Sequence, residues 1–197
     1  EDPDTLQVTI VNGDLSFVRQ PVMLGHYVSS RLTGTEYVMN GLIGDAMDAS
    51  LKNGLYPDRA GSHHVFVNTR PHAGPLPRPQ GVIVVGLGEE GKLKPADLIA
   101  TVRNGVMAWA QRLSERPDTG STFELAATLI GSGGIDMSAG QSADLIVQGV
   151  CQANAKLSEG RDGGDQRDPA RPWPPVTRLY LIEIYLSRAA EAFRALR

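Results

Sequence analysis

Apolar runs of strand length alternate with longer amphipathic stretches along most of the chain. Six runs are rich in β-branched or aromatic residues and are bounded by turn residues, which predicts six strands. They cover residues 6–11, 21–26, 64–68, 81–85, 123–130 and 176–185. Four segments carry apolar residues at helical spacing and predict helices. They cover residues 37–51, 95–113, 138–157 and 187–196.

The order of these elements is β-β-α-β-β-α-β-α-β-α, without internal repeats. Strands that alternate with helices favour parallel pairing with helices on both faces of the sheet. We therefore predict a single α/β domain over residues 1–197, a three-layer α/β/α sandwich with a mixed, mostly parallel sheet. An antiparallel pairing of the first two strands is compatible with this order.

Side-chain patterns give further expectations for the helices and loops. Residues 37–51 read as one continuous helix whose apolar face includes Tyr37 and Val38. Cys151 lies within an amphipathic pattern and is expected in the core, and Phe193 is expected to face inward. The polar, charged and proline-rich segment 158–175 is predicted to be a mobile surface loop.

Composition limits the kinds of partner. A hydrophobic share of 41% and a charged share of 21% are ordinary for a globular protein. The net charge of -3 argues against binding nucleic acid or an anionic membrane. No apolar run is long enough for a membrane span. A single cysteine cannot form an internal disulfide and suits a cytoplasmic location. The chain starts with Glu1 and no apolar signal core, so we expect a piece of a longer protein.

The strongest candidate site is the glycine cluster after the fifth predicted strand, Gly131-Ser132-Gly133-Gly134. Glycines let backbone amides approach a ligand, and the next helix would present its N-terminus there. A phosphate, diphosphate or carboxylate would fit these amides, whereas the carboxylate of Asp136 suits a ribose hydroxyl or an amine. Ser138 and Gln141 match a helix capping box. In the alternative, the glycines only form a tight turn and Asp136 or Ser138 only caps the helix.

Further candidates follow other predicted strands. Gly86 and Gly88 end the fourth strand beside two glutamates, which favours a structural turn over a ligand contact. His26 could act as an acid, a base or a hydrogen-bond donor, and Asn68 could touch a ligand, although both residue types are often structural at strand ends. His, Cys and carboxylate residues show no metal-ligand spacing, so we expect no metal and no cofactor.

Ser132 also allows a catalytic interpretation. A hydrolase elbow has the pattern Gly-x-Ser-x-Gly at a strand-to-helix turn. Gly134 fits this pattern, but Ile130 occupies the position of the first glycine. A hydrolase acting on an ester or ADP-ribosyl-type substrate through Ser132 or His26 is therefore the alternative to a binding module.

Two family resemblances extend these expectations. The stretch GVIVVGLGEEGKLKPADLIATVRNGVMAWAQ is similar to the N-terminal domain of leucyl aminopeptidases, which has a macro-domain-like fold. LIGSGGIDMSAGQS resembles the glycine-rich loop with which macro domains hold the diphosphate of ADP-ribose. The segments GHYVSSRLTGTEYVMNGLIG, GLYPDRAGSHHVFVN, VIVVGLGEEGKL and IEIYLSRAAEAFRAL resemble a region of large bacterial proteins that carry a CHAT (caspase-like) peptidase domain.

The chain departs from these families in ways that affect function. It lacks the aminopeptidase motif Asn-Thr-Asp-Ala-Glu-Gly-Arg and a caspase-type His and Cys pair, so the resemblance implies no peptidase activity. It also lacks the Asn-Ala-Ala-Asn stretch of macro domains, and we find no counterpart of their adenine-binding Asp. We expect a non-catalytic sensor or interaction module that binds a nucleotide-like or anionic small molecule and regulates an attached caspase-like peptidase. A purely structural assembly module is a further alternative.

Overall fold

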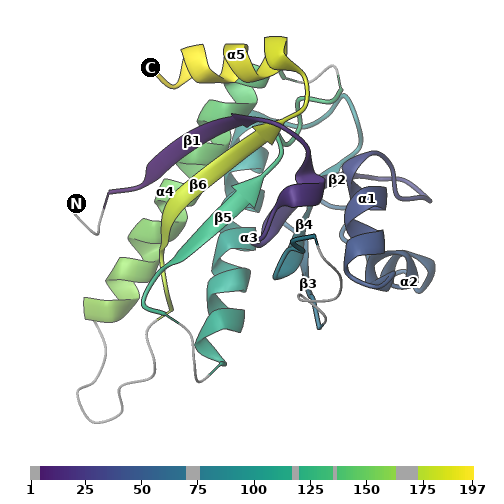
Figure 1. The fold of residues 1–197 in the computed structure, drawn as a ribbon, viewed down its shortest axis with the longest axis horizontal. Helices are drawn as coiled ribbons and strands as arrows, with labels where there is room; N and C mark the ends of the chain where they lie inside the picture. Colours follow the sequence, from purple (N-terminus) through teal and green to yellow (C-terminus); the bar gives the residue numbers. More distant parts are fainter. Residues whose placement is uncertain (1–4, 70–75, 117–119, 135–136, 163–172) are drawn as a thin grey trace.

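The computed structural model describes residues 5–69, 76–116, 120–134, 137–162 and 173–197. It contains a six-stranded sheet in the order β1-β6-β5-β2-β4-β3 (Figure 1). The strands are β1 (Gln7–Asn12), β2 (Val22–Tyr27), β3 (His63–Val67), β4 (Gly81–Gly88), β5 (Phe123–Ala127) and β6 (Val176–Glu183). All neighbouring strands pair in parallel except β3 and β4, which are antiparallel.

Helices cover both faces of this sheet, and each face has its own hydrophobic cluster. The cluster on one face joins alternate strand residues to α3 (Pro95–Ser114), α4 (Ala139–Asp162) and α5 (Leu186–Ala195). The cluster on the other face involves the short 3-10 helix η1 (Leu15–Phe17), α1 (Thr35–Leu42) and α2 (Ala46–Lys52). The predicted three-layer α/β/α architecture with a mixed, mostly parallel sheet is confirmed.

The long helices form as their patterns predict. Pro95 lies in the first turn of α3, where its missing N–H costs no hydrogen bond. The predicted stripes of α3 and α4 are buried against the sheet and against each other. They consist of Leu98, Val102, Val106, Trp109 and Leu113 in α3, and Leu145, Ile146, Gly149, Val150, Ala153 and Leu157 in α4.

The expected single helix over residues 37–51 is wrong. The chain breaks at Gly44 and Asp45, which both have a positive φ, and the side chain of Asn40 accepts hydrogen bonds from Met47 N and Asp48 N at 3.0 Å. Asn40 thereby supplies a start for α2. The break changes the buried face: Tyr37 and Val38, expected inside, are exposed. Met39, which the pattern did not place on the apolar face, is buried, and Ile43 and Met47 are buried as expected.

Four other expectations need correction. Cys151 is exposed on α4, and Phe193 is exposed on α5, where the Arg197 guanidinium lies over its ring. β1 and β2 belong to one sheet but are not neighbours, so they do not form an antiparallel pair. Residues 158–162 continue α4, which shortens the predicted loop 158–175 at its start; residues 163–172 lie outside the described part.

Candidate functional site

A cleft of about 910 Å³ opens at the edge of the sheet where the five parallel strands end. Residues that follow β1, β2, β4, β5 and β6 line it, together with the first turn of α1. Parallel strands place their carboxyl ends at one edge, so these separate loops converge there. This is the position at which the strand-glycine-helix pattern predicted a site.

The glycine turn after β5 forms one wall of the cleft. Gly131 has φ +82°, and Gly131, Gly133 and Gly134 all line the cleft. Among the described residues, the amides of Gly133 and Gly134 have no hydrogen-bond partner. A Cβ at Gly133 would meet no atom within 4 Å, so this residue faces open space. The turn therefore has backbone amides without a described partner beside the cleft. Asp136 lies outside the described residues.

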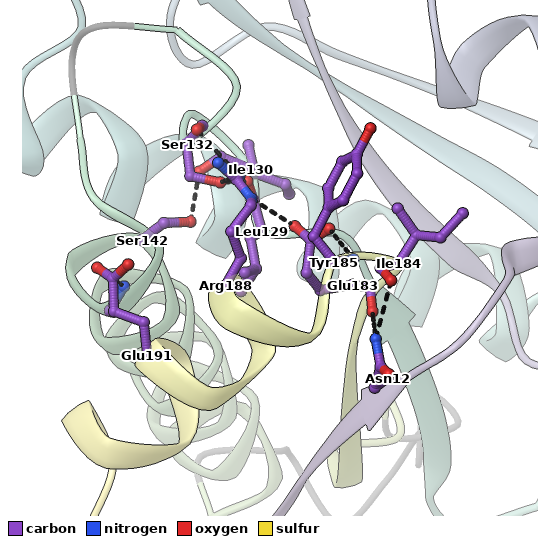
Figure 2. A network of polar contacts seen from close by, with 11 residues as sticks. Asn12, Leu129, Ile130, Ser132, Ser142, Glu183, Ile184, Tyr185, Arg188 and Glu191 are labelled. Carbon is purple, nitrogen blue, oxygen red and sulfur yellow. Dashed lines mark hydrogen bonds and ion pairs between the residues drawn. The ribbon is translucent and has the colours of Figure 1, made fainter.

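Ser132 is turned away from the cleft and is absent from its lining. Its side chain is only 3% exposed and donates a hydrogen bond to Leu129 O. Figure 2 shows Arg188 of α5 reaching this serine: its Nη2 donates to Ser132 Oγ at 2.6 Å and to Ser132 O at 3.0 Å, while its Nε donates to Glu183 Oε2 at 2.9 Å. Ser132 thus fastens the turn to α5, and this geometry does not suit a nucleophile.

Ser138 and α5 hold the start of α4. Ser138 Oγ accepts a hydrogen bond from Gln141 N at 3.1 Å, which confirms its capping role. Glu191 Oε1 accepts from Gly140 N at 3.1 Å, and this bond, with a second from Ser138, lowers the pKa of Glu191 below its usual value. Ser142 Oγ donates to Ile130 O at 2.7 Å (Figure 2). Ser138 does not line the cleft, so its contacts stabilise the turn from the side that faces away from the cleft.

His26 lies at the base of the cleft in a buried polar cluster. It is 2% exposed, and its Nδ1 is 2.8 Å from Oε1 of Glu36, a residue of the first turn of α1. Tyr56 Oη donates to the same carboxylate oxygen at 2.9 Å. Burial raises the pKa of Tyr56 well above its ordinary value, and the Glu36 charge acts in the same direction. The Glu36 carboxylate therefore favours a proton on Nδ1 of His26, which leaves Nε2 as the acceptor.

The other predicted site residues lie outside the cleft lining. A Cβ on Gly86 would come within 2.3 Å of Arg59 O, so this glycine serves a close backbone approach. Gly88 has φ +79°; its carbonyl accepts a hydrogen bond from Val28 N, and its N–H donates to Asp58 O. Asn68 follows the antiparallel β3 and therefore lies at the opposite edge of the sheet, where its Nδ2 donates to Pro79 O.

The structure adds cleft residues that the sequence analysis missed. Asp14 follows β1, Glu90 follows β4, and Tyr185 and Arg188 follow β6. Asp14 places a carboxylate in the cleft, whereas no counterpart of the adenine-binding Asp of macro domains was found in the sequence. Each of these residues comes within a few positions of a strand end, and this position is the sequence signal that they share.

Neighbouring residues contact some of the charged groups in the cleft. The Ser16 hydroxyl and, at 2.8 Å, Ser16 N both donate to Asp14, and these two hydrogen bonds lower the pKa of Asp14. Glu183 is paired with Arg188. Within the described part of the chain, no group of three or more His, Cys, Asp or Glu residues could hold a metal ion. The same residues contain no helix with the length and apolar character needed to cross a membrane.

Comparison with known proteins links this fold to macrodomains. Neither a protein-family model nor a curated protein matches the sequence. The macrodomain of Mycobacterium tuberculosis DarG has a TM-score of 0.52 and 14% identity, over 88% of this chain and 97% of that one. A Trypanosoma brucei macrodomain in complex with ADP has a TM-score of 0.62 and 9% identity, over 97% and 69% of the two chains.

A mutant Oceanobacillus iheyensis macrodomain with ADPR gives a similar result, with a TM-score of 0.59 and 13% identity over 100% of this chain and 95% of that one. Likeness at such low identity concerns the arrangement of strands and helices and not the side chains. The chain therefore has a macrodomain-like α/β/α fold.

Proposed function

We propose that this domain binds a nucleotide-like small molecule in the cleft at the carboxyl ends of the parallel strands. The observation that carries the proposal is the glycine turn, whose Gly133 and Gly134 line the cleft with amides that have no partner among the described residues. Unpaired amides that face a cavity are ready donors for ligand oxygens. The related fold of proteins solved with ADP or ADPR supports a ligand of this chemical kind.

Other side chains suit the remaining parts of such a ligand. Tyr185 is 66% exposed at the rim, where its ring can stack against a base. Val28, Val38 and Ile184 add apolar surface to the same cleft. The exposed carboxylate of Asp14 can accept a hydrogen bond from an exocyclic amine. Base, ribose and linking oxygens would each find a matching group in one cavity.

A thermal-shift screen with nucleosides, nucleotides and ADP-ribose tests this proposal. At a ligand concentration of 100 Kd, binding to the native state adds about 2.7 kcal/mol of stability, which raises the Tm of a chain of this size by about 5–10 °C. Gly133→Val should abolish the shift without unfolding the chain, because its new side chain would point into open cleft space.

Gly41→Val is the matched control. Gly41 is exposed on α1 and does not line the cleft, and a Cβ added to it would meet no atom within 4 Å. This variant should therefore respond to ligand as the wild type does. A panel in which no compound raises the Tm, or an equal shift in Gly133→Val, contradicts binding at this site.

The resemblance to regions that accompany CHAT peptidases indicates what ligand binding could control in a larger protein. We infer that the domain regulates an attached caspase-like peptidase, with the occupied cleft as its signal. The compound found in the screen should then change the peptidase activity of the whole multidomain protein. An unchanged activity at saturating ligand contradicts the regulatory role and leaves the binding role intact.

The His26–Glu36 pair favours a second candidate function, hydrolysis of a bound ester or ADP-ribosyl-type substrate. A buried histidine with Nδ1 held by a carboxylate can use Nε2 as a general base toward water. Ser132 takes no part in this candidate, because its hydroxyl is committed to Leu129 O and Arg188.

A further inference from the structure

We propose that the cleft selects an uncharged, hydroxyl-rich ligand of the nucleoside class over one that carries a diphosphate, and that Glu90 makes this selection. The proposal rests on the proposed function and specifies the ligand of the same cleft. Its basis is the balance of charge in the lining and the position of Glu90 beside the glycine turn.

Carboxylates outnumber cations in the cleft. Four acidic side chains line it, and Arg188 is the sole lysine or arginine among the described residues that do so. The acidic residues are Asp14, Glu36, Glu90 and Glu183. Arg188 already contacts Glu183 and both oxygens of Ser132, so its guanidinium is largely committed before any ligand enters. A diphosphate would therefore enter a site whose described lining offers no free compensating cation.

Glu90 differs from the other three carboxylates in its contacts. Asp14, Glu36 and Glu183 each accept hydrogen bonds from neighbouring residues. Among the described residues, Glu90 has no hydrogen-bond or ion-pair partner. Its Oε1 lies 2.7 Å from the position that a Cβ on Gly134 would occupy, so the carboxylate covers the α-carbon of the glycine turn. A phosphate bound to the turn amides would meet this charge.

A ribose hydroxyl fits the same place. It can donate to the Glu90 carboxylate in a charge-assisted hydrogen bond and accept from an amide of the turn. His26 Nε2, which has no partner among the described residues and belongs to a side chain only 2% exposed, supplies a further acceptor in the cleft. The site thus offers both hydrogen-bond donors and acceptors to hydroxyl groups. In contrast, the Glu90 carboxylate repels an anion, and His26 Nε2 as an acceptor has no hydrogen to donate to one.

The test compares adenosine and ADP-ribose by isothermal titration calorimetry on the wild type and on Glu90→Gln. A diphosphate carries two negative charges, and the Glu90 carboxylate beside the turn would repel both. We expect wild type to bind adenosine more tightly, and Glu90→Gln to shift the ratio of the two Kd values toward ADP-ribose by about tenfold or more. High salt should reduce this shift.

Glu89→Gln is the matched control, since Glu89 is the adjacent glutamate, pairs with Lys92 and does not line the cleft. It should leave the ratio unchanged. Tighter binding of ADP-ribose than adenosine by the wild type, or a shift of less than about threefold in Glu90→Gln, overturns the selection while the binding function stands. Absence of binding by either ligand to both proteins overturns the binding function and the selection together.

Discussion

His26 shows how the partners of one residue determine its possible role. Glu36 Oε1 holds Nδ1 of the imidazole, and Tyr56 Oη donates to the same carboxylate oxygen. The Tyr56 ring packs edge-on against the imidazole, with 4.7 Å between the ring centroids. The hydrogen bond between Nδ1 and the buried Glu36 side chain holds the imidazole in place. The cluster is therefore a rigid floor for the cleft, and it leaves one nitrogen available.

His26→Asn separates the structural role of the imidazole from a catalytic one. The amide nitrogen of Asn takes the place of Nδ1, so it can keep the hydrogen bond to Glu36, while the Nε2 position is lost. If His26 is a general base, turnover should fall by about 10²-fold or more with binding retained. Product formation from ester and ADP-ribosyl substrates, followed by chromatography, is the measurement.

Two other results of that experiment decide between the candidate functions. Wild type that releases no product above the buffer control on any substrate supports the non-catalytic module. Equal turnover by wild type and His26→Asn removes His26 from the mechanism. Urea unfolding of both proteins shows whether the buried hydrogen bond to Glu36 survives. Its loss would lower the free energy of unfolding by about 1–3 kcal/mol.

At the scale of elements, α5 holds the binding turn in position. Asn12 Nδ2 donates to the carbonyls of Glu183 and Ile184 at 2.9 Å, which fixes the loop that leads from β6 into α5 (Figure 2). Arg188 then joins this loop to the glycine turn, and Glu191 joins α5 to the start of α4. The turn owes its shape to contacts with residues more than 50 positions away.

Arg188→Met should destabilise the fold by about 2 kcal/mol, because it leaves the half-buried Glu183 without its cation and Ser132 O without its donor. Chemical denaturation measures the change in the free energy of unfolding. Arg112→Met is the control: its pair with Glu115 is exposed, so it should cost less than about 0.5 kcal/mol. Equal losses in the two variants would show that Arg188 does not hold the turn.

Local sequence signals explain which elements could be predicted. The stripes of α3 and α4 follow one helical period without interruption, and the run at β4 is apolar at almost every position, as buried parallel strands are. The break between α1 and α2 could not be found in this way. It depends on the Asn40 side chain reaching two amides seven and eight residues ahead, which periodicity does not record.

At the scale of the whole molecule, strand order decides which candidates meet. The glycine turn and His26 come from β5 and β2, which are neighbours in the sheet, so both reach the cleft. Asn68 also ends a strand, but β3 runs antiparallel and carries it to the far edge. Pairing direction depends on contacts distant in sequence, and so the class of fold could be predicted while the complete site could not.

Binding of a nucleotide-like ligand at the carboxyl edge is tested most directly by NMR on the ¹⁵N-labelled chain. Titration with adenosine and with ADP-ribose should produce saturable amide shifts at Gly133 and Gly134, with little change at Asn68 and Gly120. Gly120 lines a separate cavity of about 820 Å³, whose other residues lie at the end of α3 or near the starts of β2, β4, β5 and β6. We expect shifts around the glycine turn for at least one ligand. Shifts confined to Asn68 or Gly120, or none with either ligand at millimolar concentration, would contradict it.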